Sequence, residues 1–245
     1  MPVIATLQRA NHGSRFRAYG LREAGALIDP FIGVDHAWMS APTFPPHAHA
    51  GFSAVSYLFL DSTTGIANRD SIGTHNLIEP GSLHWTTAGR GVVHEEVPAE
   101  TGKTVHSLQI FVDLTRSQRG IDPFALSLRP QDVPVIQRPG VRVRVATGSF
   151  GGTRSPLSPP TDVTILDISL DEGAALSVPA AAGRCAFVMP IFGSVEVDGE
   201  VFSLEDLKLP VFPAQDDART ITLRAAAGAA KVVFFEGTPL RSAPG

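Results

Sequence analysis

The chain has 245 residues, of which 43% are hydrophobic and 18% are charged, and its formal net charge is −4. These values are typical of a folded protein, and the lack of a basic stripe excludes direct binding to nucleic acid. No apolar run approaches the roughly 18 residues that cross a membrane, and the N-terminal residues lack the apolar core of a secretion signal, so we expect a cytoplasmic protein without a membrane partner. The single cysteine, Cys185, excludes an internal disulfide and a multi-thiolate metal site, and its apolar neighbours predict a buried side chain.

Short stretches of alternating or β-branched residues, separated by glycine and proline, predict an antiparallel all-β fold. In chain order they are FSAVSYLFL, HSLQIFVDL, VRVRVATG, VTILDISL, SVEVDGEVFSL and ARTITLRA. Asp198 and Gly199 lie between two alternating runs and predict a two-residue hairpin. Few segments have a helical pattern.

The chain divides into two strand-rich halves, between which arginine, proline, glycine and serine are frequent from residue 115 to residue 162. The halves resemble each other weakly: SYLFLDSTTGIANRD followed by LIEPGSLHWTTAG has a counterpart in FVMPIFGSVEVDG followed by FSLEDLKLPVFPA. This repeat favours two copies of one β-barrel over a single large sandwich. We expect an N-terminal metal-binding domain over residues 1–120, a linker with strands over residues 121–160, and a C-terminal domain over residues 161–245.

All histidines lie in the first half of the chain, so any metal site built on imidazole lies there as well. They are His12, His36, His47, His49, His75, His84, His94 and His106. Residues two apart on a strand point to one face, so PPHAHAGF directs His47 and His49 into one space, and VVHEE does the same for His94 and Glu96. Glu95 would face the other way.

Three imidazoles and one carboxylate suit Fe(II), Mn, Ni, Cu or Zn. An isolated H-x-H pair is more often a surface or structural pair, and the spacing alone leaves that alternative open.

Four segments together resemble the pirin family of the cupin superfamily. They are DPFIGVDHAW, PPHAHAGFSAVSYLF, NRDSIGTHNLIEPGSLHWTTAGRGVVHEE and HSLQIFVDL. The resemblance is dense over residues 25–115 and looser in the second half. It implies a bicupin, in which two antiparallel jelly-roll β-barrels pack together. It also implies one divalent metal ion, Fe(II) before Mn, Ni, Cu or Zn, held in the N-terminal barrel by His47, His49, His94 and Glu96. The C-terminal barrel of pirins usually lacks metal ligands, and this chain has no histidine after His106.

The sequence departs from the family pattern at three positions. Ser53 and Asn68 replace a glutamate and a histidine, and His84 stands where pirins often have glutamine. We interpret His84 as a pocket-wall or surface residue, with a role as a metal ligand as the alternative. Beside Asn68, we expect Arg69 and Asp70 to form a buried ion pair that supports a turn, with a catalytic role as the alternative.

The remaining histidines have simpler interpretations. His106 opens the apolar strand HSLQIFVDL, and we expect it to hydrogen-bond in the core or behind the metal ligands. His12, His36 and His75 are expected at the surface or in loops. Arg90 and Gly91 are expected to shape the loop before His94.

The resemblance implies a metal-dependent dioxygenase similar to quercetin 2,3-dioxygenases, which open the central ring of a flavonol with O2 and release carbon monoxide. Glu96 would be both a metal ligand and the catalytic base that takes the 3-hydroxyl proton. Phe52 and Trp85 would hold the aromatic rings at the barrel mouth. A dioxygenase for another enolic or phenolic substrate would have the same site. The alternative is a non-enzymatic, iron-dependent regulator that binds a transcription factor or a metabolic enzyme, and the net negative charge favours such a protein partner over DNA.

Overall fold

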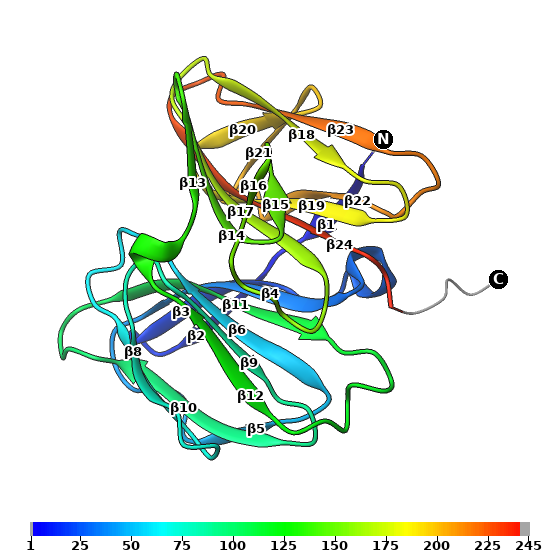
Figure 1. Ribbon diagram of the computed structural model, residues 1–245. Coiled ribbons are helices and arrows are strands. Elements are labelled where there is room, and N and C mark those ends of the chain that lie inside the picture. The colour runs from blue at the N-terminus through cyan, green and yellow to red at the C-terminus, as the bar shows by residue number, and fades with distance from the viewer. Residues whose placement is uncertain (1, 241–245) are drawn as a thin grey trace.

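The first of two β-barrels consists of a seven-stranded and a four-stranded antiparallel sheet in the computed structural model, which describes residues 2–240 (Figure 1). The larger sheet has the strand order β12 (Phe124–Leu128), β9 (Leu83–Thr87), β6 (Phe52–Leu58), β11 (Val105–Asp113), β4 (Phe31–Met39), β3 (Phe16–Leu21) and β2 (Gln8–His12). The smaller sheet has the order β5 (His47–His49), β10 (Val92–Pro98), β7 (Ile66–Asp70) and β8 (His75–Ile78).

The second barrel repeats this arrangement. Its larger sheet has the order β1 (Val3–Thr6), β22 (Lys208–Phe212), β19 (Cys185–Phe192), β24 (Ala230–Gly237), β17 (Val163–Leu170), β14 (Val141–Thr147) and β13 (Val135–Arg138). Its smaller sheet has the order β18 (Ala175–Ala180), β23 (Arg219–Arg224), β20 (Ser194–Val197) and β21 (Glu200–Ser203). A short hairpin is formed by β15 (Ser149–Phe150) and β16 (Thr153–Arg154).

The described residues contain two 3-10 helices, η1 (Gly25–Ile28) and η2 (Pro130–Asp132), and none of their helices is long or apolar enough to cross a membrane. The two barrels confirm the predicted all-β bicupin fold. The predicted hairpin is also present, because β20 and β21 are joined by Asp198 and Gly199, both with positive φ.

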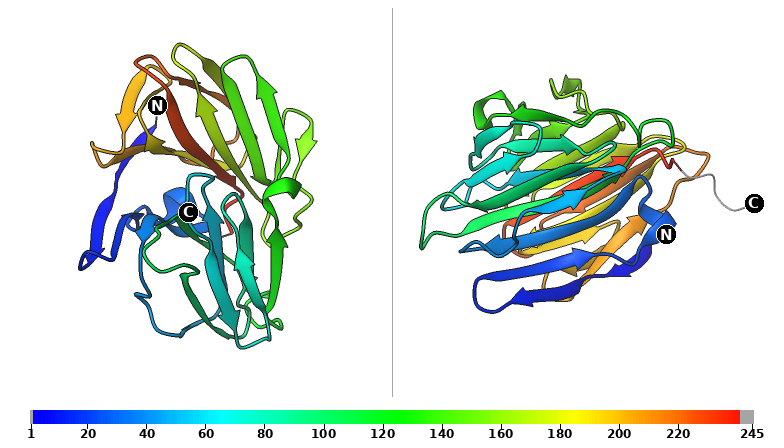
Figure 2. Two further views of the ribbon diagram at one scale, coloured as in Figure 1. Left: turned by 90° about the vertical axis from the view of Figure 1, so that its left-hand side faces the viewer. Right: turned by 90° about the horizontal axis from the view of Figure 1, so that it is seen from below.

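The two barrels are structural repeats that exchange their first strands. Division of the chain before β1 and before β12 gives two repeats, and the strands of the two large sheets then correspond one to one. The weak sequence repeat agrees, because its first copy covers β6 to β9 and its second covers β19 to β22. However, β1 pairs with β22 of the second barrel, and β12 pairs with β9 of the first. Figure 2 (left) shows the dark blue N-terminal strands running from the second barrel to the first.

This exchange crosses the domain limits expected from the sequence. Of the strands in the predicted linker, residues 121–160, β12 belongs to a sheet of the first barrel, whereas β13 and β14 belong to a sheet of the second. The first 120 residues in turn give β1 to the second barrel. The chain therefore connects the barrels by strands that complete both large sheets.

The two large sheets pack face to face and form the main hydrophobic core. Val55 and Tyr57 of β6 face the second barrel and lie in one buried cluster with Phe187 and Phe235. The ring of Phe31, on β4, makes edge contacts with the rings of Phe187 and Phe235, with ring centroids 5.2 and 5.5 Å apart. Such edge-to-face contacts add to the free energy of apolar burial. The barrels are thus held together by the outward faces of their large sheets.

The interiors of the two barrels differ in polarity. The second barrel is filled by an apolar cluster that includes Val143, Leu166, Ile221 and Phe234. The interior cluster of the first barrel is much smaller and consists of Met39, Leu58, Ile66, Ile78 and Val105. Polar side chains occupy much of the remaining interior of the first barrel, and the candidate site lies among them.

A buried polar network links the large sheets. The Tyr57 hydroxyl donates to Asp167 Oδ2 at 2.8 Å and accepts from Arg144 Nε at 3.2 Å. Lys231 Nζ lies 3.2 Å from the same Asp167 oxygen. Because these groups are shielded from water, each hydrogen bond offsets a substantial desolvation cost.

Replacement of Tyr57 by phenylalanine should lower the free energy of unfolding by about 1–3 kcal/mol, because Asp167 and Arg144 each lose a buried partner. Urea unfolding measures the change. Tyr19→Phe is the matched control, because the half-buried Tyr19 hydroxyl has no hydrogen bond among residues 2–240. Equal stability of Tyr57→Phe and the parent would show that the network contributes nothing.

A second buried pair corrects the prediction for His36 and confirms that His106 hydrogen-bonds in the core. His36 is fully buried, not at the surface, and its Nε2 lies 2.7 Å from Nε2 of His106. His106 Nδ1 donates to Asp61 Oδ1 at 2.8 Å, and Trp38 stacks on the His106 ring. His36 and His106 contact Phe59, which belongs to the core between the barrels, so His106 does not lie behind the metal ligands. Burial, reinforced by His106, holds the pKa of His36 well below its usual value.

The low pKa of His36 predicts acid destabilisation. The folded protein keeps His36 neutral, whereas the unfolded chain takes up a proton below about pH 6.5, so this contribution to stability is present above that pH and is lost as the pH falls. The loss should reach about 1.4 kcal/mol per pH unit for one group. Urea unfolding between pH 7.5 and pH 5 should therefore show a shallower decline for His36→Gln than for the parent. The exposed His75→Gln variant is the control, and an unchanged slope in His36→Gln would contradict the assignment.

Candidate metal centre

The H-x-H segment forms the short edge strand β5, which pairs with β10. In this pairing His47 is opposite His94, and His49 is opposite Val92. Strand alternation places His47 and His49 on one face, and the register brings His94 to the same face. Gly51, with φ of 80°, then turns the chain into β6 in a conformation that favours glycine.

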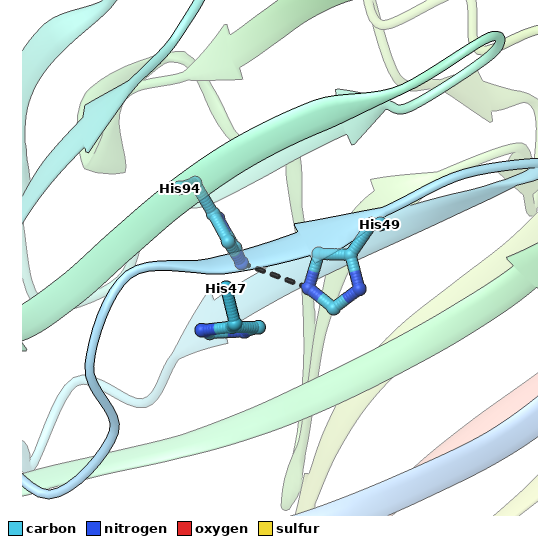
Figure 3. Close-up of side chains that lie close together, drawn as sticks. All are labelled: His47, His49 and His94. Atoms are coloured by element: carbon cyan, nitrogen blue, oxygen red, sulfur yellow. Dashed lines mark hydrogen bonds between the residues drawn. The ribbon is translucent and has the colours of Figure 1, made fainter.

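The three imidazoles converge, as Figure 3 shows. Their potential ligand atoms all lie within 4.8 Å of one another, and His49 Nε2 is 2.9 Å from His94 Nε2. His47 Nδ1 donates to the carbonyl oxygen of Pro45 at 3.0 Å, which leaves Nε2 of His47 with a free lone pair. No second group of three such side chains occurs in residues 2–240. The arrangement can bind a metal ion through three nitrogens.

Burial keeps two of the three imidazoles, those of His49 and His94, neutral. Desolvation, with a smaller effect of His47, lowers the pKa of His49 to about 4. Desolvation, reinforced by His49 and His47, lowers the pKa of His94 to about 3. Both rings are therefore neutral at pH 7, which is the form that donates a lone pair to a metal.

Glu96 lies in the same pocket as the histidines. Its carboxylate is hydrogen-bonded to a residue of a different strand, β6. Its two carboxylate oxygens accept from Ser56 Oγ at 2.9 and 2.7 Å, and Ser56 Oγ also lies 3.2 Å from Gln109 Oε1. Burial raises the pKa of Glu96 to about 7, and the hydrogen bond from Ser56 opposes this shift. Glu95, its neighbour, points to the other face and pairs with Arg69, as strand alternation predicts. Glu96 thus lines the pocket of the three histidines, but it is not part of the group whose ligand atoms lie within 4.8 Å of one another.

His84 is a wall residue inside the first barrel. It is buried on β9, where its Nδ1 is 2.9 Å from Ser127 Oγ and its Nε2 is 3.2 Å from Thr86 Oγ1. Asn68 Nδ2 also approaches His84 Nε2 at 3.4 Å and donates to Asn76 at 2.8 Å. Both nitrogens of His84 therefore have protein partners, and His84 lies outside the cluster of three histidines.

The predicted ion pair between Arg69 and Asp70 is wrong. Arg69 is exposed and binds Glu95, with Nε donating to Oε2 at 2.7 Å. Asp70 Oδ1 instead accepts from the backbone N–H groups of Ile72 and Thr74 at 3.1 and 2.8 Å. Because neighbouring residues on a strand point to opposite faces of the sheet, the side chains of Arg69 and Asp70 cannot contact each other. Asp70 does support the turn, as expected.

A cavity of about 200 Å³ opens over the three histidines and Glu96. Its apolar wall is formed by Phe16, Met39, Phe44, Ile66 and Phe111, and its other polar side chains are Arg22, Asp35, Ser107 and Gln109. None of these residues is among the site residues predicted from the sequence. Gln109 and Ser56 could have been found from strand alternation, because each is a polar residue within a largely apolar strand and faces inward.

Of the two aromatic residues predicted at the mouth, Trp85 needs correction. Trp85 is fully buried in the core between the barrels, because it shares a face of β9 with Leu83. Phe52 packs on His49 and Phe111, with ring centroids 5.2 and 5.7 Å away, beside the cavity. Ser53 shares the face of Val55 toward the second barrel, so a longer side chain there would point away from the histidines.

The second barrel has no equivalent ligands. Its strands β18 and β23 correspond to β5 and β10, and their inward residues include Val178, Ala180, Ile221 and Leu223. Cys185 is buried, as predicted, and burial raises the pKa of its thiol to about 12. The candidate metal centre is therefore confined to the first barrel in the described part of the chain.

The fold and site define a bicupin with one histidine-rich pocket. The family model for Pirin matches residues 16–112. Pirin of Rattus norvegicus is 36% identical over 202 residues, which cover 80% of this chain and 67% of that protein. Pirin-like protein 2 of Arabidopsis thaliana is 30% identical over 246 residues, which cover 97% of this chain and 74% of that protein. The chain belongs to the pirin family.

Solved structures share the whole fold. GK1651 from Geobacillus kaustophilus has a TM-score of 0.87 at 26% identity, over 99% of this chain and 97% of that chain. Quercetin 2,3-dioxygenase from Acinetobacter baumannii has a TM-score of 0.84 at 22% identity, over 99% and 89%. The bacterial pirin YhhW from Escherichia coli, in complex with nickel(II), has a TM-score of 0.76 at 17% identity, over 98% and 100%. At these identities the last two comparisons establish the fold.

Replacement of His94 by alanine removes one of the three imidazoles of the cluster and should reduce bound metal from one ion per chain to nearly none. Metal analysis after loading with Ni(II) or Fe(II) and dialysis measures this, and circular dichroism verifies the fold. His75→Ala, on the exposed strand β8, is the matched control. Full metal content in His94→Ala would exclude His94 as a ligand.

Proposed function

We propose that this protein is a metal-dependent dioxygenase that opens flavonols such as quercetin with O2. The observation that supports it is the convergence of His47, His49 and His94 beside the carboxylate of Glu96 in a pocket with aromatic walls. The three histidines and Glu96 would hold one divalent ion, with Fe(II) as the first choice. When bound, such an ion supplies a Lewis acid and open positions for a substrate oxygen and O2.

The residues of the pocket would divide the remaining tasks. Glu96 would accept the proton of the 3-hydroxyl group, which leaves an electron-rich flavonolate for the reaction with O2. The hydroxyl of Ser56 would hold the carboxylate in place, as it does in this structure. Because drug-sized ligands usually fill about 300–1,000 Å³, a cavity of about 200 Å³ would enclose one ring system and leave the other at the mouth.

The test is the loss of quercetin absorbance in air with protein reconstituted separately with Fe(II), Mn(II), Ni(II) or Cu(II), together with O2 uptake and carbon monoxide release. Turnover with at least one metal is expected. No turnover with any metal would overturn the proposal and favour the iron-dependent regulator that binds a protein partner.

The neighbouring glutamates provide a matched pair of variants. Glu96→Gln should lower kcat by about 10²–10⁴-fold, the usual contribution of a general base. Glu95→Gln changes the same residue type on the opposite face and should leave turnover unchanged. Equal kcat in Glu96→Gln and the parent would exclude Glu96 as the base.

A further inference from the structure

Arg22 is the one cationic side chain that lines the metal pocket in the described part of the chain. It follows β3 directly, and its guanidinium binds Asp35 Oδ2 on the neighbouring strand β4. The guanidinium carbon also lies 5.4 Å from the ring centroid of Phe111, in the cation–π range. Phe111 in turn lies 5.9 Å from the ring of His49. Along this wall, Phe111 thus lies between the histidine cluster and a positive charge.

Two glycines leave room for this ion pair. A Cβ on Gly20 would lie 2.6 Å from Asp35 Oδ1, and a Cβ on Gly33 would lie 3.1 Å from the carbonyl oxygen of Leu21 and 3.5 Å from Arg22 Cδ. Neither glycine has a left-handed φ, so their backbone does not require glycine. The lack of a side chain at Gly20 therefore leaves the space that the Asp35 carboxylate occupies, which fixes the position of Arg22.

Asp35 uses only part of the hydrogen-bonding capacity of Arg22. One terminal nitrogen donates to Asp35, and the remaining N–H groups have no partner within residues 2–240. The side chain of Arg22 is 48% exposed, whereas that of Asp35 is 14% exposed. A guanidinium has five donors in a planar fork that matches the two oxygens of a carboxylate. Arg22 therefore presents free donors at the pocket while Asp35 holds it from behind.

We propose that Arg22 determines substrate specificity by binding an acidic oxygen, a carboxylate or an ionised phenol, on an aromatic substrate whose ring packs against Phe111. The inference rests on the proposed function, because it places the reacting part of the same substrate at the histidines. A ring against Phe111 has one edge toward His49 and the other toward Arg22, so one molecule can reach both. Phe16 and Phe44, whose rings are 5.0 Å apart, complete the aromatic wall.

The experiment compares two synthetic flavonols that share one skeleton, a 3-hydroxyflavone with a carboxylate on its outer ring and the uncharged methyl ester of that compound. Calorimetry with the Ni(II)-loaded protein measures their Kd values. The parent should bind the acid about tenfold or more tightly than the ester, as expected for a charge-assisted bidentate contact. Arg22→Met should lose this preference and keep the affinity for the ester. An equal preference in Arg22→Met and the parent would overturn the inference.

Two further variants separate recognition from stability. Arg22→Met/Asp35→Asn also removes the carboxylate that Arg22→Met leaves without its partner, and it should show the same loss of preference. Arg17→Met removes a cation of the same sheet that lies over Trp38, outside the pocket, and should keep the preference.

The outcomes also separate this inference from the proposed function. Quercetin turnover without a preference for the acid in the parent would overturn the role of Arg22 alone. A preference that depends on Arg22, without turnover by any metal form, would support the binding site and overturn the dioxygenase.

Discussion

The face-to-face packing of the two large sheets is the constraint on which the rest of the structure depends. Val55, Tyr57, Phe187 and Phe235 are among the fully buried residues of this core, and full burial of such a side chain contributes about 1.5–3 kcal/mol. The core stabilises both barrels at once. The interior of the first barrel therefore does not need to supply the main apolar core, and it can hold imidazoles, amides and a carboxylate.

The chemistry of the site follows from that polar interior. Histidines buried in it lose the solvation of their charged form, so they stay neutral and available as ligands at pH 7. The carboxylate of Glu96 is held in the same environment by hydrogen bonds from Ser56. Nearer the mouth, Asp35 holds Arg22 against Phe111. Each charged group in the pocket thus has a hydrogen-bonding or ionic partner that sets its position.

The two barrels have the same topology and different interiors. Their strands correspond one to one, and each repeat gives its first strand to the sheet of the other. Where β5 and β10 carry histidines, the corresponding β18 and β23 carry aliphatic residues such as Val178 and Ile221. The second barrel therefore has the apolar interior of a structural domain, and the exchanged strands tie it to the barrel that holds the site.

The sequence by itself determined the β class, the repeat and the shared face of His47 and His49 on one strand. These depend on local alternation, in which residues two apart share a face whatever surrounds them. Only the tertiary structure decided which face of each strand lines the pocket and which face packs against the second barrel. His36 and Trp85 are buried because their side of the large sheet meets the second barrel, and Arg22 reaches the pocket because Asp35, on the next strand, binds it. Such choices depend on packing between distant segments, which alternation along one strand does not specify.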